Sequence, residues 1–252
     1  MEENDRIYKE TFPIQSYGVR PDKSARLAHI CNLLQEVAGK HAHRLNYDID
    51  QLRRENRTWF LYRLQLEMED YPRWDDSITI ETWPSGGKGV LAYREFLIYN
   101  ESMDILGRGT SQWMIVDLQK KRPVPIPGEV FEMKVEKRGH TLKPQREKIN
   151  LDHQDPLGSP TEFRIWRKDL DVNGHVNNVS YINWITESIP EDIYSEHRLN
   201  HLDIIYQAEC KYGDKVIVKT YPTDQDHDFK HHIYRSQDQK TLALAQTRWG
   251  VE

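Results

Sequence analysis

The chain of 252 residues lacks several features that mark common classes of protein. It has only two cysteines, Cys31 and Cys210, which are too few for a disulfide framework or a thiolate metal site. It has no run of about 18 apolar residues, so no transmembrane helix is expected. The acidic N-terminus has neither the basic start nor the apolar stretch of a signal peptide. We therefore expect a globular, cytoplasmic protein with reduced thiols.

The chain also lacks an excess of positive charge. The net charge is −5 at pH 7, whereas nucleic-acid-binding domains are usually strongly basic, so nucleic acid is not an expected partner. One stretch is an exception, because residues 119–150 contain nine Lys or Arg and four Glu, a local charge of +5. This basic stretch could steer an acidic partner or be an ordinary solvated linker. The sequence favours neither interpretation.

What the chain does have is a run of polar residues at every second position, namely Asp171, Asn173 and His175. If residues 171–175 are extended, these three side chains leave the backbone on the same side, because successive Cβ atoms of a strand alternate between faces. Gly174 would let the run bend tightly as it ends. The pattern predicts that a carboxylate, an amide and an imidazole converge on one reactant.

A helix is expected directly after this run. Asn177 and Asn178 are preferred N-cap residues, and the apolar positions that follow have helical spacing: Val179, Ile182, Ile185 and Ile189. The start of a helix offers backbone N–H groups and a partial positive charge, which can stabilise a developing oxyanion.

The chain also repeats itself. Residues 76–84 resemble residues 214–222, and both segments alternate like strands before ending at a proline. Each half is expected to be one long helix followed by several strands. The first helix is predicted over 24–43, with Leu27, Ile30, Cys31, Leu34, Val37, Ala38 and His41 on one face. Strands are predicted over 58–66, 76–83, 91–100 and 108–117.

These patterns predict an α+β protein in which an antiparallel sheet wraps around a buried helix in each half. The predicted organisation is an N-terminal domain over 1–125, a proline-rich linker over 126–160 and a C-terminal domain over 161–252.

Several ordered motifs resemble those of one family, the fatty acyl-ACP thioesterases, which are double hotdog proteins. The motifs are Asn32–Glu36 with His41, Tyr71–Asp76, Glu81–Trp83, Gly107–Trp113, Asp169–Asn178, Tyr181–Ile182, Glu187–Pro190 and Glu209–Cys210. Gln207 and Ala208 depart from the pattern, because members commonly have two arginines there. The resemblance implies hydrolysis of fatty acyl-ACP, which terminates fatty acid synthesis, with acidic acyl carrier protein (ACP) as partner. The missing organelle-targeting extension suggests a bacterial-type enzyme.

The resemblance also implies which residues act. Its catalytic groups correspond to Asp171, Asn173, His175 and Glu209, with Cys210 as an alternative nucleophile. If residues 206–210 form a strand, Glu209 and Cys210 point to opposite faces, so only one of them can reach His175. We favour Glu209, because a carboxylate buried among apolar atoms becomes a useful general base. No metal and no cofactor is expected, since a thioester is already activated.

In the family, the first half binds the acyl chain. The candidate lining residues are Trp59, Leu61, Met68 and Trp113, although for each one taken singly ordinary core packing is the favoured interpretation. The first half has no Asp-x-Asn-x-His pattern over 17–24, and Tyr71 stands where Glu209 aligns. One active site per chain is therefore expected.

A metal site at His227, His231 and His232 is disfavoured, because their polar surroundings favour a solvated hairpin. The rival functions are an acyl-CoA thioesterase or another hotdog-fold enzyme, and a non-catalytic acyl-carrier binding protein. The sequence leaves open the preferred acyl chain and whether two chains form a homodimer.

Overall fold

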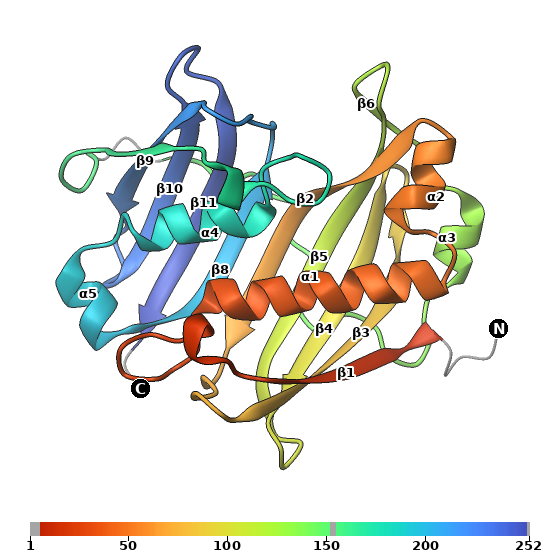
Figure 1. Cartoon of the computed structure of the whole chain (residues 1–252), viewed down its shortest axis with the longest axis horizontal. Coiled ribbons are helices and arrows are strands. Elements are labelled where there is room, and N and C mark those ends of the chain that lie inside the picture. The colour runs from red at the N-terminus through yellow and green to blue at the C-terminus, as the bar shows by residue number, and fades with distance from the viewer. Residues whose placement is uncertain (1–5, 152–154, 251–252) are drawn as a thin grey trace. The chain divides into compact units, whose positions relative to one another are not determined.

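The computed structural model describes residues 6–151 and 155–250. It divides the chain into two compact units, the N-terminal unit Met1–Gln145 and the C-terminal unit Arg146–Glu252 (Figure 1). The N-terminal unit contains β1 (Tyr8–Pro13), η2 (Ser16–Gly18), α1 (Leu27–Arg44), α2 (Ile49–Arg54), β2 (Arg57–Met68), β3 (Ser77–Lys88), β4 (Leu91–Tyr99), β5 (Ile105–Asp117), β6 (Arg122–Val124) and α3 (Gly128–Glu132). The C-terminal unit contains β7 (Thr161–Arg164), η3 (Arg167–Asp169), α4 (Asn178–Thr186), α5 (Glu191–Glu196), β8 (Arg198–Tyr206), β9 (Lys215–Pro222), β10 (Asp228–Arg235) and β11 (Thr241–Gly250).

The two units have the same sheet topology. Antiparallel pairing gives the order β1-β3-β4-β5-β2 in the N-terminal unit, where β6 also pairs with β5. The C-terminal unit has the order β7-β9-β10-β11-β8, again antiparallel. Equivalent strands therefore occupy equivalent places, which confirms the predicted internal repeat.

Matching side-chain hydrogen bonds mark the repeat in the last long strand of each unit. The Trp113 indole donates to the Ser111 hydroxyl at 2.8 Å on β5, and the Trp249 indole donates to the Thr247 hydroxyl at 3.2 Å on β11. Each tryptophan thus satisfies its one polar group on its own strand.

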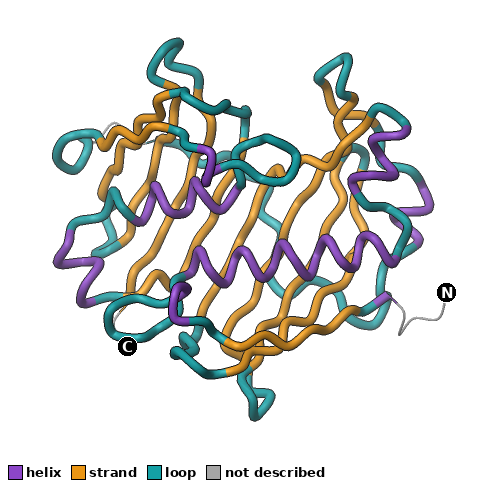
Figure 2. Tube along the Cα trace, in the orientation of Figure 1, coloured by secondary structure: helices purple, strands orange, loops and turns teal. Residues whose placement is uncertain are grey.

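Helix α1 crosses the sheet of the N-terminal unit (Figures 1 and 2). All seven residues of the predicted apolar face are buried, which confirms the predicted face. The helix starts at Leu27 and not at Ser24. The reason is local, because the Ser24 backbone N–H and hydroxyl both donate to the Asp22 carboxylate, at 2.9 and 2.7 Å, and hold residue 24 in a turn.

The helix of the C-terminal unit is shorter than expected. Helix α4 has 9 residues and ends at Thr186, and α5 begins only after Pro190. The Thr186 hydroxyl donates to the Ile182 carbonyl at 2.8 Å, and the Ser188 hydroxyl donates to the Trp184 carbonyl at 2.7 Å. These side chains satisfy carbonyls at the helix end, and the proline prevents its continuation.

The N-terminal unit extends past residue 125, where the sequence places the start of a linker. Ile126 and Val130 join a buried apolar cluster with Leu52, Ala92 and Ile115. Residues 126–145 therefore pack on the first sheet and form part of its unit.

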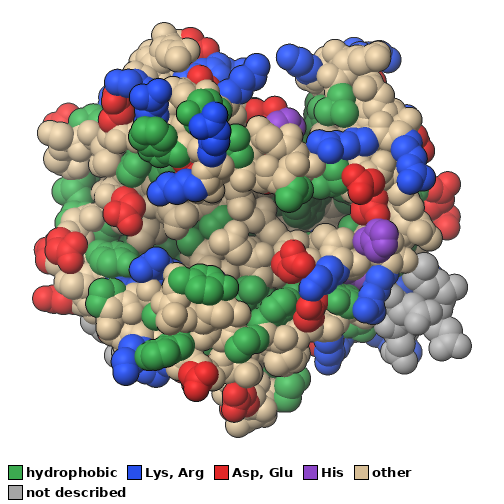
Figure 3. Space-filling view, viewed as in Figure 1, with side chains coloured by type: hydrophobic (Ala, Val, Ile, Leu, Met, Phe, Trp, Pro, Cys, Tyr) green, Lys and Arg blue, Asp and Glu red, His purple; other side chains and the backbone are tan. Residues whose placement is uncertain are grey.

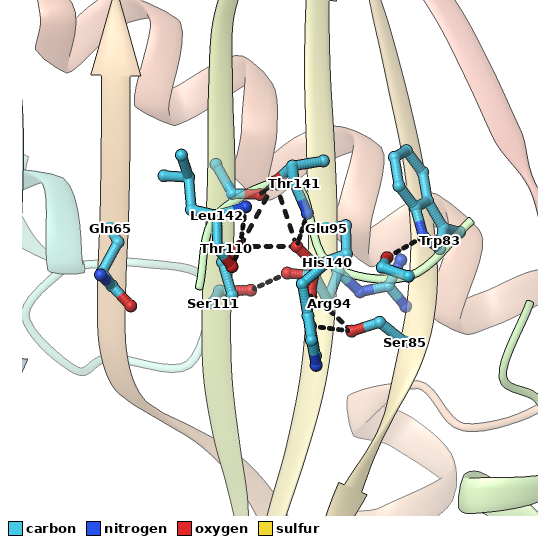
Figure 4. A network of polar contacts seen from close by, with 12 residues as sticks. Gln65, Trp83, Ser85, Arg94, Glu95, Thr110, Ser111, His140, Thr141 and Leu142 are labelled. Carbon is cyan, nitrogen blue, oxygen red and sulfur yellow. Dashed lines mark hydrogen bonds and ion pairs between the residues drawn. The ribbon is translucent and has the colours of Figure 1, made fainter. Parts of the chain in front are cut away.

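A buried carboxylate fastens the end of this segment. The Glu95 side chain on β4 is fully buried and accepts hydrogen bonds from the Ser85 hydroxyl at 2.5 Å, the Thr110 hydroxyl at 2.5 Å and the Thr141 backbone N–H at 2.9 Å (Figure 4). The His140 imidazole contacts the same carboxylate at 2.8 Å. Because neighbouring residues of a strand face opposite sides, and Arg94 contacts His41 of α1, Glu95 lies on the face away from α1.

Candidate active site

The predicted polar run forms a tight hairpin loop. Leu170 pairs with Val176 across it. The Asp171 N–H donates to the His175 carbonyl at 2.7 Å, and the Gly174 N–H donates to the Asp171 carbonyl at 3.0 Å. Gly174 has a φ of 76°, a left-handed conformation that favours glycine. The expectation that residues 171–175 are extended is therefore wrong.

The Asp171 carboxylate organises the loop. One of its oxygens accepts hydrogen bonds from the backbone N–H groups of Asn173 at 2.8 Å and His175 at 3.0 Å, and the other accepts from the Asn173 side-chain amide at 3.3 Å. Aspartate commonly bonds to backbone groups a few residues ahead and so stabilises a turn in place of a strand. Asp171 thus fixes the loop and orients Asn173.

Glu209 reaches this loop from a distant part of the chain. One of its carboxylate oxygens lies 3.4 Å from Nδ1 of His175. The imidazole is 44% exposed and the carboxylate side chain is 55% exposed. The structure thus brings Glu209 and His175 together, but the predicted burial of the Glu209 carboxylate among apolar atoms is wrong.

Glu209 also lies outside the strand in which it was expected. Strand β8 ends at Tyr206, because the backbone N–H groups of Gln207 and Ala208 both donate to the Leu242 carbonyl, at 2.8 and 3.2 Å. Two donors on one acceptor break the regular ladder, much as a β-bulge does. The loop that follows places the Glu209 side chain in solvent and buries Cys210.

Cys210 is a buried thiol. Its sulfur lies 3.2 Å from the Tyr181 hydroxyl, and burial raises the pKa of the thiol to about 11. The thiol is therefore neutral near neutral pH, whereas only a thiolate is a good nucleophile. The geometry favours Glu209 over Cys210 as the group that acts with His175.

Helix α4 follows the loop and is capped as predicted. The Asn177 side chain accepts a hydrogen bond from the Val179 N–H at 3.0 Å, so Asn177 is the N-cap. Val179, Ile182 and Ile185 are buried. The Tyr206 hydroxyl donates to the Asn178 carbonyl at 3.1 Å and ties the helix to β8. The partial positive charge of the α4 N-terminus thus lies two residues after His175.

The four residues predicted to bind the acyl chain lie in the N-terminal unit. Leu61 pairs with Trp113 and Met68 with Gly107 in the β2–β5 register, which places the candidate side chains on the face covered by α1. Leu61 and Met68 are buried. The rings of Trp59 and Trp113 meet edge to face, with centroids 6.5 Å apart.

Sequence reasoning missed a cation on the same face. A nitrogen of the Arg94 guanidinium lies 3.0 Å from Nδ1 of His41 and 3.2 Å from the Thr82 hydroxyl. Burial lowers the pKa of Arg94 to about 10, because a charged group loses hydration there. The signal was present, since Arg94 stands between Ala92 and Phe96 at an inward position of an alternating strand.

Two of the three histidines of the disfavoured metal site lie in the sheet and not in a solvated hairpin. His231 lies on β10, is fully buried and contacts the hydroxyls of Thr220 at 3.0 Å and Thr247 at 2.8 Å. His232 contacts the Thr241 hydroxyl at 2.9 Å. The prediction of a solvated hairpin is wrong for His231 and His232, which lie on an interior strand of the sheet, whereas His227 lies in the turn between β9 and β10.

Comparison with known protein families shows to which family the chain belongs. The model of the acyl-ACP thioesterase N-terminal domain matches residues 5–133, and that of the acyl-ACP thioesterase C-terminal domain matches residues 146–251. The chain belongs to the acyl-ACP thioesterase family. The resemblance that the motifs indicated is thereby confirmed.

Curated members of the acyl-ACP thioesterase family align with most of the chain. It is 32% identical to the chloroplastic oleoyl-acyl carrier protein thioesterase of Coriandrum sativum, over 89% of this chain and 65% of that protein. It is 29% identical to oleoyl-acyl carrier protein thioesterase 1 of Arabidopsis thaliana, over 98% of this chain and 77% of that protein. The chain thus spans between 65% and 77% of the length of these two relatives.

Solved structures of the acyl-ACP thioesterase family have the same fold. An acyl-ACP thioesterase from Bacteroides thetaiotaomicron superimposes with a TM-score of 0.88 at 21% identity, over 99% of this chain and all of that one. The 12:0-ACP thioesterase from Umbellularia californica gives a TM-score of 0.85 at 24% identity, over 98% of each chain. The predicted fold, an α+β double hotdog, is confirmed. None of the helices that the structure describes combines the length and apolar character needed to cross a membrane.

Proposed function

We propose that the protein hydrolyses the thioester between a fatty acid and acyl carrier protein, with Asp171, Asn173, His175 and Glu209 as its active site. Family membership supports the reaction class. The observation that carries the assignment of residues is the 3.4 Å contact between the Glu209 carboxylate and the His175 imidazole. In this proposal the C-terminal unit performs the chemistry.

In the proposed reaction, Glu209 accepts a proton from a water molecule as the water oxygen attacks the thioester carbonyl carbon. The N–H of the Asn173 side-chain amide that does not bond to Asp171, together with the N-terminus of α4, stabilises the resulting oxyanion, while His175 positions the Glu209 carboxylate and the water. The oxyanion collapses, the carbon–sulfur bond breaks, and the protonated Glu209 returns its proton to the sulfur of the carrier. The products are a free fatty acid and a carrier protein thiol, and no cofactor is consumed.

The acyl chain is proposed to bind on the α1 face of the N-terminal unit, where Trp59, Leu61, Met68 and Trp113 lie. This face is apolar over most of its length, as an alkyl chain requires. Replacing Leu61 by Trp should lower kcat/KM for oleoyl-ACP more than for dodecanoyl-ACP, since each methylene in a pocket contributes about 1 to 3 kcal/mol. An unchanged ratio of the two values would assign Leu61 to the core alone.

The decisive experiment incubates the purified protein with dodecanoyl-, palmitoyl- and oleoyl-ACP and with the matching CoA esters, and measures released fatty acid by mass spectrometry. We expect hydrolysis of at least one acyl-ACP and a lower kcat/KM for its CoA ester. Glu209→Gln should reduce kcat by about 100-fold or more. The neighbouring replacement Cys210→Ala is the matched control and should keep most of the activity.

Two other outcomes would support one of the alternative functions. Equal hydrolysis of ACP and CoA esters would identify an acyl-CoA thioesterase. Binding of acyl-ACP without release of fatty acid would identify a non-catalytic carrier-binding protein. The expected cytoplasmic location stays a prediction, which fractionation of cells that express the protein tests.

A further inference from the structure

Large apolar side chains are exposed around the active-site loop. Val172, which lies between Asp171 and Asn173, is 99% exposed, and Trp166 and Tyr212 are 50% and 47% exposed. Single exposed apolar residues are common, but three on adjoining segments at a catalytic loop mark an interaction surface. All three belong to the C-terminal unit.

Two cationic side chains stack on these aromatic rings. The Arg164 guanidinium lies 5.1 Å from the centre of the Trp166 ring, and the Arg167 guanidinium lies 4.9 Å from the centre of the Tyr212 ring. Such stacking holds an arginine in place while its N–H groups stay available to an anion. Both arginines are therefore preorganised for binding at low entropic cost.

Backbone hydrogen bonds join the two segments into one surface. The Ile165 N–H donates to the Asp214 carbonyl at 3.0 Å, and the Gly213 N–H donates to the Ile165 carbonyl at 3.1 Å. Lys168 and Lys211 flank the joined segments in the sequence. We name this the docking surface, and it consists of Arg164, Trp166, Arg167, Lys168, Val172, Lys211 and Tyr212.

Carboxylates near the docking surface are occupied by internal bonds. Asp169 accepts a hydrogen bond from the Trp166 N–H at 2.7 Å, Asp214 accepts from the Lys211 N–H at 2.9 Å, and Asp171 holds the loop. Within residues 6–151 and 155–250, none of the four basic side chains of the docking surface forms an ion pair. Their positive charge is thus available to a partner.

The basic stretch over 119–150 differs in this respect. Arg138 forms an ion pair with the buried Glu81 at 2.5 Å, and Lys134 pairs with Glu136 at 2.9 Å. Part of its charge is therefore neutralised within the chain. On the C-terminal unit, Figure 3 shows Lys and Arg side chains interspersed with hydrophobic ones.

We propose that the docking surface binds acyl carrier protein. This inference rests on the proposed function, in which the substrate is a thioester carried by an acidic protein. The arginines and lysines would pair with carboxylates of the carrier, while Trp166, Val172 and Tyr212 cover an apolar patch between them. Because Val172 lies within the catalytic loop, docking there delivers the thioester beside His175 and Glu209.

The test compares one acyl group on two carriers, dodecanoyl-ACP and dodecanoyl-pantetheine. The double replacement Arg167→Glu with Lys168→Glu should raise KM for dodecanoyl-ACP about tenfold or more, because charges that favoured the carrier now repel it. Its kcat/KM for dodecanoyl-pantetheine should stay within about twofold of the original value, since that substrate has no carrier protein.

Lys143→Glu with Lys148→Glu is the matched control, because it changes charge by the same amount on exposed residues of the basic stretch. We expect a small effect of this control on KM for dodecanoyl-ACP. An equal increase in KM for dodecanoyl-ACP in both double variants would show general electrostatic steering and overturn the assignment of the docking surface. A parallel loss on dodecanoyl-pantetheine would show damage to the catalytic loop and would also overturn it.

A binding measurement separates this inference from the proposed function. Calorimetric titration with the carrier protein lacking an acyl group requires no turnover. Weaker binding to the Arg167→Glu, Lys168→Glu variant, with unchanged binding to the control, supports the docking surface even if no acyl-ACP is hydrolysed. Equal binding to both variants overturns it even if hydrolysis is observed.

Discussion

The loops at residues 20–24 and 171–175 are equivalent parts of the two units and have nearly the same backbone. Each follows a short 3₁₀ turn, η2 or η3, and is closed by one bridge, Val19 with Ala25 or Leu170 with Val176. The closing hydrogen bond runs from Arg20 N–H to the Ser24 carbonyl at 2.8 Å and from Asp171 N–H to the His175 carbonyl at 2.7 Å. Lys23 has a φ of 71° where Gly174 has 76°.

The side chains on this shared backbone differ. In the first loop the Asp22 carboxylate bonds to Ser24, which is buried. In the second loop, Asn173 and His175 occupy the equivalent places, and the half-exposed imidazole meets Glu209. The backbone therefore does not require catalytic residues. The proposed chemistry therefore belongs to side chains placed on a loop that the fold builds in either unit.

The largest expected effect comes from making the two loops identical. Replacing Asp171, Val172, Asn173, Gly174 and His175 by Arg, Pro, Asp, Lys and Ser transfers the first loop into the C-terminal unit. Because Lys23 already has a left-handed φ in the first loop, we expect a folded protein whose hydrolysis of acyl-ACP falls about 1000-fold or more. Calorimetry and activity on the preferred acyl-ACP provide the check.

Ser24→Ala is the control for this exchange, because it alters the equivalent position of the first loop. We expect it to keep most of the activity. A loop exchange that retains substantial turnover would contradict the assignment of His175 and its neighbours.

Glu95 and Glu209 differ in burial, because Glu95 is fully buried and the Glu209 side chain is half-exposed. Glu95→Gln removes charge from a fully buried carboxylate with several donors, so the free energy of unfolding should fall by about 2 to 4 kcal/mol. Glu209→Gln alters an exposed side chain and should change the free energy of unfolding by no more than about 0.5 kcal/mol. The same replacement should abolish most turnover. Urea unfolding curves with parallel kinetics measure both. A reversed ranking of the two variants would show that Glu209 is structural.

His231 and Phe96 occupy equivalent strand positions, since they pair with Thr220 and Thr82. Burial lowers the pKa of His231 to about 3 from its ordinary value of 6.5, so the folded state keeps it neutral. Its contribution to stability is complete above pH 6.5 and is lost as pH falls toward 3, by about 1.4 kcal/mol per pH unit.

His231→Gln removes this titration and retains polar groups for both threonines. Urea unfolding at about pH 7 and about pH 5 should therefore show a smaller pH dependence in His231→Gln than in the original protein. An identical pH dependence would place the proton uptake elsewhere.

The smallest effect is expected from treating the folded protein with a reagent that alkylates thiols. Burial raises the pKa of both Cys31 and Cys210, so iodoacetamide at about pH 8 should label neither in the folded protein and both after denaturation. Mass spectrometry counts the added groups. Rapid labelling of Cys210 with loss of activity would restore it as a candidate nucleophile.

Local patterns predicted much of the fold. The spacing from Leu27 to His41 predicted the buried face of α1, the alternation over 108–117 predicted β5, and Asn177 was recognised as an N-cap. These features were predictable because each depends on residues within a few positions of one another. The family followed from motifs whose order and spacing survive in the sequence.

Features of the site that depend on competing hydrogen bonds were not predictable. Alternating polar residues over 171–175 are compatible with a strand, but the Asp171 carboxylate bonds to two backbone N–H groups and makes a turn. The pattern of residues 206–210 also predicts a strand. In the structure the strand ends at Tyr206, because the N–H groups of Gln207 and Ala208 both donate to the Leu242 carbonyl. That break decided the exposure of Glu209.

By itself, the sequence determined which chemical groups are present, the repeat that carries them and the family to which the chain belongs. Only the tertiary structure decided that the Glu209 carboxylate contacts the His175 imidazole at a solvent-exposed position and that Cys210 is buried in the core. The physical reason is that this meeting depends on where β8 ends against β11, and pairing between distant strands leaves no signature in local periodicity.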